Sequence, residues 1–223
     1  METSGQPTLR IPIILLALVN LALLGARLWP WQEAMNLPGN GTTAVDPAIT
    51  LAAYIGLGFW IGSVRTPAGR KSLFSAAMLG ILAGLFLVGQ VMLAARQSAE
   101  ESAGPDRVQI GLLVCAAVVL GTVGLRTARA GNTMGFSLVC TIWASMVCCL
   151  MACTAILGEA YLATGGAEPA DSWKQYEGLA IGNPATQSLV HSLDTLSGFL
   201  LLGPLVGCLA GAVFASLGKP AKA

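Results

Sequence analysis

Apolar residues fill six long runs of this 223-residue chain, and within these runs they do not alternate with polar residues. A bilayer core is about 30 Å thick and needs about 20 apolar residues of helix to cross it. In lipid, only helices and closed barrels satisfy the backbone, and the lack of alternation argues against a barrel. The pattern therefore predicts transmembrane helices near 11–29, 47–64, 73–95, 108–125, 136–158 and 196–217.

Lysine and arginine are unevenly divided between the polar segments that separate these runs. With the N-terminus in the cytoplasm, eight fall on the inner side and four at or beyond the outer ends. All acidic residues except Glu2 lie at or beyond the outer ends. Cytoplasmic segments of membrane proteins are enriched in basic residues, so we expect this orientation. An even number of helices then places both termini in the cytoplasm, with outer loops at 30–46, 96–107 and 159–195.

Two helix boundaries have alternative readings. Arg10 followed by an apolar run and "LLGA" is also compatible with a signal peptide cleaved near Ala26, although an uncleaved helix is favoured because the residues before that cut match a cleavage site poorly. The pair Asn183-Pro184 is typical of a cap and a first helical residue. We therefore expect the last helix to begin near 184 and to stand above the membrane before entering it.

The composition agrees with one all-α domain over residues 1–223, a polytopic transmembrane helix bundle. Hydrophobic residues make up 55% of the chain, charged residues 10%, and mean hydropathy is +0.72. A typical soluble domain is about 25% charged, so most of this surface does not face water. The net charge of +1 gives no basic field for nucleic acid. We expect a protein of the bacterial inner membrane whose main partner is the lipid bilayer.

The stretch "VRTPAGRKS" at 64–72 has some features of a phosphate-binding loop, but it lacks the required spacing. A P-loop needs G-x-x-x-x-G-K-[ST] after a strand. Here Gly62 is too far from Gly69, Arg70 separates Gly69 from Lys71, and both flanks are predicted to be transmembrane. We interpret the stretch as a cytoplasmic turn between two helices. A similar basic turn at 126–136 follows about 61 residues later, which suggests an internal repeat or simply the composition that inner turns share.

The six cysteines all lie within apolar runs, no CxxC pair occurs, and His191 is the single histidine. The usual Cys/His zinc patterns therefore cannot be assembled. We favour small buried hydrophobic residues. The alternative is a disulfide or a soft-metal site among the cysteines of one helix, Cys140, Cys148, Cys149 and Cys153. No metal or other cofactor is predicted.

Glycines at four-residue spacing form stripes on three of the predicted helices. Such stripes let another helix approach closely, either in the same chain or in another. Pro204 interrupts the last of these helices and predicts a kink there. The proposed packing glycines are Gly58, Gly62, Gly80, Gly84, Gly203, Gly207 and Gly211.

Ionisable and amide side chains collect near the predicted outer ends of the helices. Charges at such positions are costly unless paired, which makes them functional candidates. One interpretation is an outward-facing vestibule for a small polar solute. The favoured interpretation is structural, with side chains that reach water or pair locally, as Arg96 would with Glu159. The candidate outer cluster is Arg27, Gln90, Arg96, Glu159, His191 and Asp194.

Enzymatic motifs are missing from the sequence. One histidine excludes H-E-x-x-H, and no G-x-S-x-G nucleophile elbow occurs. We predict a non-enzymatic multi-pass membrane protein that acts as a membrane-embedded subunit of a larger assembly, with other membrane subunits or further copies of itself as partners. The alternative is a small-solute transporter or a substrate-binding membrane subunit. No sequence feature identifies the ligand.

Overall fold

The structure is a computed structural model of the full chain. It describes the backbone of residues 10–29, 41–64, 66–97, 107–163 and 184–218. Side chains are described over these ranges except at 10, 41–44, 94–97, 159–163 and 184–191.

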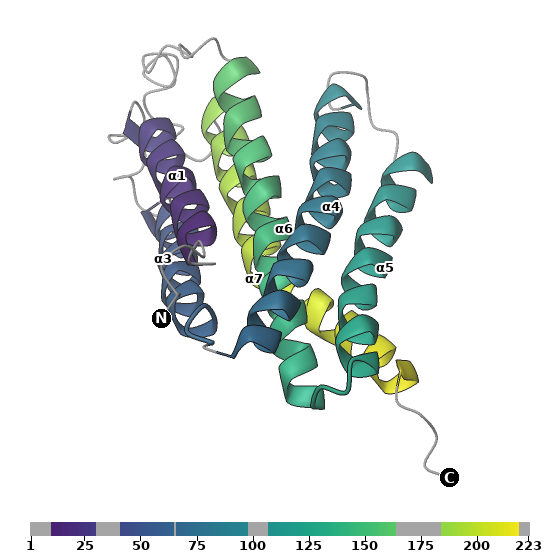
Figure 1. Ribbon diagram of the computed structural model, residues 1–223. Helices are drawn as coiled ribbons and strands as arrows, with labels where there is room; N and C mark the ends of the chain where they lie inside the picture. The colour runs from purple at the N-terminus through teal and green to yellow at the C-terminus, as the bar shows by residue number, and fades with distance from the viewer. Residues whose placement is uncertain (1–9, 30–40, 65, 98–106, 164–183, 219–223) are drawn as a thin grey trace.

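Six α-helices make up the described part of the chain, which confirms the predicted all-helical bundle. They run alternately up and down, so the start of α1, the end of α7 and the two short turns share one end of the bundle (Figure 1). We call this end the cationic end, because Arg70, Lys71, Arg126 and Arg129 lie beside its turns. The helices are α1 (Arg10–Leu28), α3 (Gly41–Ile61), α4 (Pro67–Gln97), α5 (Arg107–Arg129), α6 (Met134–Ala163) and α7 (Pro184–Gly218).

Five of the six helices are long and apolar enough to cross a membrane. The exception is α3, where the predicted span 47–64 is wrong at both ends. The helix begins earlier, at Gly41, and it stops at Ile61, where Gly62 and Ser63 form a turn. Among residues with described side chains its apolar part is Val45–Ile61, although the helix itself is 21 residues long. The predicted start of the last helix near 184 is confirmed, since α7 begins at Pro184.

Local capping explains why α4 begins at Pro67 and not at the predicted residue 73. The Thr66 hydroxyl accepts a hydrogen bond from the backbone N–H of Gly69 at 3.3 Å, as an N-cap does. Proline suits the first helical position, because its fixed φ fits the helix and its missing N–H has no intrahelical partner there. The basic pair Arg70-Lys71, predicted as part of a turn, therefore lies in the first turns of α4.

The turn between α5 and α6 has both a C-cap and an N-cap. Gly131 has a positive φ of 78°, its N–H donates to Ala128 O at 3.1 Å, and the N–H of Asn132 donates to Thr127 O at 3.3 Å. This is a Schellman motif, which closes α5 at the position where glycine carries little strain. Thr133 then caps α6 by accepting from the N–H of Phe136 at 3.3 Å. The similar sequences of the two inner turns do not give similar packing: α5 packs against α6, whereas α3 and α4 are not a closely packed pair.

Helix α6 is the centre of the bundle and packs against α1, α4, α5 and α7. Of its membrane-spanning window, 72% is buried, against 22–33% for the other four long spans. The residues on two of its faces are mostly small. Ala144 and Cys148 face α4, while Thr141, Ser145 and Cys149 face α7.

Glycines on α4 and α7 lie directly against these small residues of α6. A Cβ atom added at Gly80 would lie 3.0 Å from the Cα of Ala144, and one at Gly207 would lie 2.9 Å from the Cβ of Ser145. A Cβ at Gly211 would meet Thr141 in the same way. Two of the glycine stripes thus pack inside the chain. In α3, Gly58 faces Ile13 of α1, and Gly62 lies in the turn beyond the helix.

Pro204 leaves one carbonyl of α7 without its helical donor, and a neighbouring helix supplies a replacement. A proline at position 204 cannot donate to the carbonyl oxygen of Leu200. The Tyr54 hydroxyl of α3 donates to this oxygen at 2.7 Å, and the Tyr54 side chain is only 3% exposed. Inside a bilayer no water could take this role, so the contact stabilises the interrupted helix and fastens α3 to α7.

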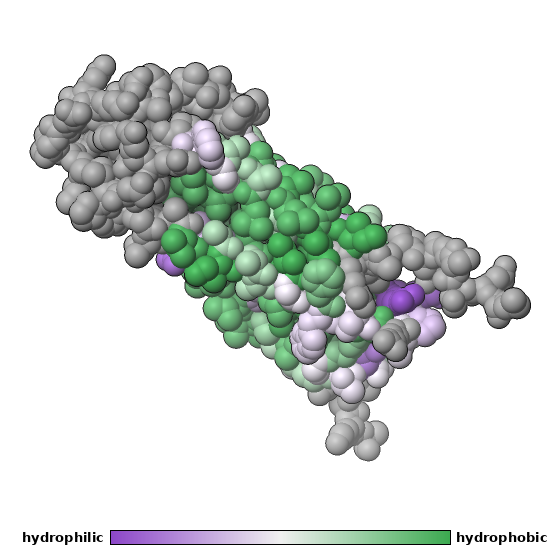
Figure 2. All heavy atoms as spheres, turned by 90° about the vertical axis from the view of Figure 1, so that its left-hand side faces the viewer, coloured by the Kyte–Doolittle hydropathy of each residue, from purple (hydrophilic) through white to green (hydrophobic). Residues whose placement is uncertain are grey.

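The outer surface of the bundle is apolar over its middle (Figure 2). Large hydrophobic side chains are exposed on every helix with described side chains except α6, among them Leu15, Leu57, Leu85, Val114 and Leu209. A soluble protein does not expose apolar surface on this scale. The surface and the five long apolar helices support an integral membrane protein in contact with the lipid bilayer.

We expect Tyr54→Phe to lower the free energy of unfolding by about 1 kcal/mol, because it leaves the Leu200 carbonyl unsatisfied in an apolar surrounding. In a Pro204→Ala background the restored N–H serves that carbonyl, so Tyr54→Phe should cost clearly less. Reversible unfolding in bicelles would measure this double-mutant cycle. Equal costs in the two backgrounds would show that Tyr54 does not compensate for the proline.

Gly80→Ala should destabilise the bundle by about 1–3 kcal/mol, because the added methyl meets the backbone of Ala144, which cannot move as a flexible side chain would. Gly56→Ala is the matched control. It lies within α3 with nothing within 4 Å of an added Cβ, so higher helix propensity should leave stability unchanged or raise it by up to about 1 kcal/mol. The same unfolding assay compares the two, and a neutral Gly80→Ala would contradict the close α4–α6 packing.

Candidate functional site

The structure describes three side chains of the predicted outer cluster, those of Arg27, Gln90 and Asp194. Arg27 of α1 and Gln90 of α4 are half-buried, and Asp194 of α7 is exposed. The Gln90 Oε1 atom is buried without a hydrogen-bond partner in the described part of the chain. None of the three lines any of the pockets described below. The side chains of Arg96, Glu159 and His191 lie outside the described residues, so the outer cluster stays a prediction.

All six cysteines are free thiols, and four of them are buried in α6. No group of three or more histidine, cysteine, aspartate or glutamate side chains is placed to hold a metal ion, as far as the described residues go. Cys148 and Cys149 line the second groove described below, and the Cys149 sulfur lies against Gly203 of α7.

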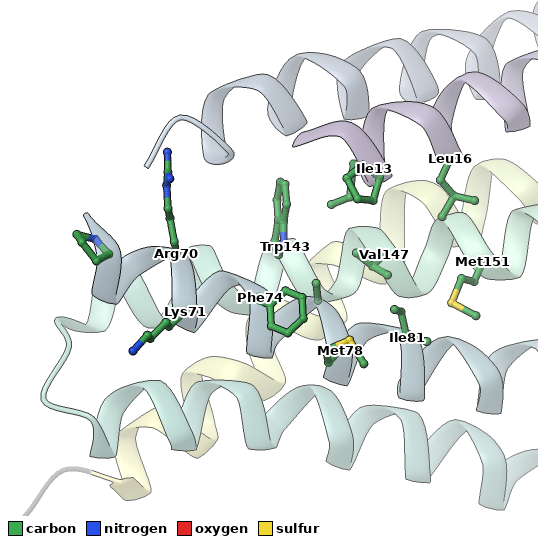
Figure 3. Close-up of a pocket in the computed structure, with 13 residues that line it drawn as sticks. Ile13, Leu16, Arg70, Lys71, Phe74, Met78, Ile81, Trp143, Val147 and Met151 are labelled. Carbon is green, nitrogen blue, oxygen red and sulfur yellow. The ribbon is translucent and has the colours of Figure 1, made fainter. Parts of the chain in front are cut away.

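A groove between α1 and α4 has a cavity volume of about 740 Å³. This size falls within the roughly 300–1,000 Å³ of typical small-molecule sites. Helix α6 forms its floor (Figure 3). We call it the α1–α4 groove, and its lining residues are Pro12, Ile13, Leu16, Pro67, Arg70, Lys71, Phe74, Ala77, Met78, Ile81, Trp143, Val147 and Met151.

The groove exists because α1 packs on α3 and α6 but not closely on α4. A buried amide fastens α1 to α6: the Asn20 Nδ2 donates to Thr154 Oγ1 at 3.0 Å and lies 3.2 Å from Leu150 O. The Asn20 side chain is fully buried. Such a bond inside a bilayer replaces contacts with water that lipid cannot offer. This bond holds α1 on α6 at a level beyond the groove, because the α1 residues that line the groove all come before Ala17 in the chain.

Two faces of α4 have different roles: one packs inside the bundle and the other lines the groove. Leu73, Ala76 and Gly80 are buried in the bundle. Phe74, Met78 and Ile81, at spacings of four and seven residues, line the groove and are 58%, 52% and 39% exposed. Because these lining residues are so exposed on an apolar surface, the groove opens sideways toward the lipid and is not an enclosed chamber.

Two cations mark one end of the α1–α4 groove. Arg70 and Lys71 are exposed and project from neighbouring positions of α4 in different directions (Figure 3). The Arg70 Nε donates to Val64 O at 3.4 Å. Lys71 also lines a smaller pocket of about 230 Å³ with Arg126 of α5. The sequence has no aspartate or glutamate from 47 to 99 or from 107 to 158, so none of the described segments that meet here provides a carboxylate.

Trp143 of α6 lies between the α1 side and α4 at the wall of the groove (Figure 3). Its side chain is fully buried, and its Nε1 donor has no hydrogen-bond partner among the described residues. A buried donor without an acceptor costs about 1–3 kcal/mol. A bound molecule with an acceptor oxygen gains this hydrogen bond only when the indole turns toward the groove, because Nε1 is closed off from solvent.

A second groove of about 580 Å³ lies between α5 and α7, with α4 and α6 beneath it. Its lining is apolar and includes small residues such as Ala117, Gly198 and Gly203. No lysine, arginine, aspartate or glutamate lines it. The two grooves thus differ mainly in charge.

In the sequence, Arg70 and Lys71 indicate only topology. Thr66-Pro67 is the signal that places them in the site, because this pair starts α4 early and brings both cations onto the groove. Trp143 had no cue of its own, because a tryptophan in an apolar run is usual for a membrane helix.

Comparison with known proteins adds no family: no protein-family model matches the chain, and neither curated proteins nor solved structures contain a match.

Proposed function

We propose that this chain is a non-enzymatic, multi-pass protein of the bacterial inner membrane that binds an amphiphilic ligand in the α1–α4 groove. This is the substrate-binding membrane subunit that the sequence offers as an alternative, with its site at the cationic end in place of the outer cluster. The observation that carries the proposal is a groove of about 740 Å³ that is open to lipid, apolar along its length and cationic at one end.

The shape and chemistry of the groove favour an amphiphile over a small polar solute. Phe74, Met78, Ile81 and Val147 offer apolar surface, which gains free energy at about 25 cal/mol for each Å² that a ligand covers. A polar solute would lose its hydration along this wall without finding partners. A ligand arriving from the membrane already has its apolar part in lipid and needs only to move sideways.

A second function, the membrane-embedded subunit of a larger assembly, is favoured by the uncharged groove between α5 and α7. Around Gly198 an added Cβ would meet nothing within 4 Å, so the backbone of α7 is accessible there. Small residues that are not covered within the chain let a helix of another subunit approach closely. The two functions are compatible, because the grooves lie on different sides of α6.

Orientation is part of the proposal. The cationic end holds four basic side chains and no acidic residue in the segments that the structure describes there, which favours a cytoplasmic location. Trp60, 67% exposed near the end of α3, suits the interface at this end, and Trp29, 75% exposed just beyond α1, suits the opposite one. Both termini then lie in the cytoplasm.

Ile81→Trp should fill the groove and weaken amphiphile binding by at least about tenfold, or about 1.4 kcal/mol. Leu82→Trp is the matched control, because Leu82 is the next residue of α4, is similarly exposed at 43% and lies outside the groove. Binding of dioleoyl lipids to the detergent-solubilised chain, counted by native mass spectrometry, measures the difference. If both variants bind as the wild type does, the groove is not the site.

Benzoylphenylalanine placed at Leu202, within the α5–α7 groove, should crosslink in native membranes to a protein of one defined mass. The same group at Leu209, which is 68% exposed on α7 but outside the groove, should give lipid adducts only. Crosslinking to protein from neither position, or equally from both, would count against a specific subunit contact.

Asp46→Cys should be labelled by a membrane-impermeant thiol reagent added outside intact spheroplasts, because Asp46 is exposed near the proposed outer end. Ser63→Cys, exposed in the turn after α3, should be labelled only after the membrane is opened. The reverse pattern would invert the proposed topology.

A further inference from the structure

We infer that the ligand of the α1–α4 groove is an anionic phospholipid of the inner leaflet, whose phosphate is bound by Arg70, with Lys71 adding positive charge from the other side of α4, and whose acyl chain lies along Phe74, Met78 and Ile81. This assignment rests on the proposed function and adds the chemical class of the ligand. Its basis is the position of the charges relative to the apolar wall.

The side chains along α4 change from charged to apolar in the order of a lipid molecule. Arg70 and Lys71 occupy the first turns, and Phe74, Met78 and Ile81 follow at successive turns. Since a helix rises 1.5 Å per residue, Ile81 lies about 16 Å along the axis from Arg70. The groove therefore passes from charged to apolar over a distance comparable to half of a bilayer core. A lipid has the same order of headgroup and chain.

The cations of α4 lie at the depth of lipid headgroups in the membrane. Trp60 lies one residue before the end of α3, at the same end of the bundle, and is 67% exposed, as expected for a tryptophan at headgroup level. Arg70 lies in the first turn of α4, only ten residues later and across the turn. Its guanidinium thus lies near the level at which lipid phosphates lie, and basic pockets between transmembrane helices on the cytoplasmic side are suited to anionic headgroups.

The positive charges of Arg70 and Lys71 are not balanced by acidic side chains in the described part of the chain. No described carboxylate faces Arg70 or Lys71, and the described segments at this end contain no acidic residue at all. The Arg70 guanidinium uses its Nε toward Val64 O, which leaves the terminal nitrogens to bind a phosphate. Lys71 and Arg126 share the adjoining small pocket, so the field around the headgroup is positive on both sides of α4.

The Trp143 indole is a hydrogen-bond donor at the wall of the groove. Trp143 is fully buried and its Nε1 lacks an acceptor within the described structure. It lies between the cations and the apolar residues Val147 and Met151 (Figure 3). In a phospholipid, the ester oxygens occupy this level between phosphate and chain, and one of them accepts from Nε1 once the indole turns toward the groove.

The test uses the full chain in dodecylmaltoside micelles, titrated with dioleoyl phosphatidylglycerol or dioleoyl phosphatidylcholine, with bound lipid counted by native mass spectrometry. The wild type should bind the anionic lipid about 10- to 30-fold more tightly, as two cations at the headgroup level imply. Arg70→Gln and Lys71→Gln should each reduce this preference about fivefold, and the double variant should abolish it.

Arg129→Gln is the matched control, because it removes a cation at the same end that lines none of the three pockets. It should leave the preference unchanged. Millimolar inorganic phosphate should not displace the lipid, because the apolar chain contributes to binding; displacement would point to a soluble phosphate ligand and overturn the lipid assignment.

The two proposals fail in different ways. If Ile81→Trp reduces the binding of both lipids but the wild type does not prefer phosphatidylglycerol, or the double variant keeps the preference, the groove binds amphiphiles and the anionic assignment is wrong. If Ile81→Trp affects neither lipid, the proposed function itself is wrong.

Discussion

Close contact between the small residues of α6 and the glycines of α4 and α7 is the constraint on which the rest of the bundle depends. Lipid gives helices no hydrophobic reason to associate, so packing and hydrogen bonds must hold them together. Gly80 lies against Ala144 on one side of α6, and Gly207 lies against Ser145 on the other. The buried hydroxyls of this interface remain satisfied within α6 itself, since Thr141 donates to Ser137 O and Ser145 to Thr141 O, both at 2.9 Å. Although α6 has hydroxyl side chains at these positions, it can therefore pack as closely as an apolar helix would.

The central position of α6 determines where the two grooves lie. Because α6 has α4 on one side and α7 on another, α1 reaches α6 only along a remaining strip, where the Asn20 amide holds it. Toward the cationic end, α1 and α4 stay apart and leave the α1–α4 groove. The α5–α7 groove lies on the other side, without charge. The same central packing thus provides one surface suited to a charged amphiphile and another suited to a helix.

The sequence predicted the helical runs well, because a bilayer needs long apolar segments and few other structures produce them. Boundaries were less accurate where local hydrogen bonds decide them: Thr66 starts α4 six residues before the apolar run, and the turn at Gly62 ends α3 early. The site could not be predicted from the pattern of residues, since it depends on which helices stay apart. Trp143 and the cations of α4 line one groove only because Asn20 holds α1 on α6, and no spacing along the chain encodes that arrangement.

The short apolar part of α3 has a consequence for the surrounding membrane. The exposed side chains of Asp46 and Trp60 are 14 residues apart, so the helix between them covers about 21 Å, roughly 9 Å less than an average hydrocarbon core. Asp46 and Trp60 lie at the two ends of this segment, so sliding along the membrane normal cannot correct the deficit. Hydrophobic mismatch of this size costs fractions of a kcal/mol per Å and is relieved when the two leaflets thin locally. The protein should therefore gather shorter-chained lipids around α3 and be more stable in thin bilayers than in thick ones.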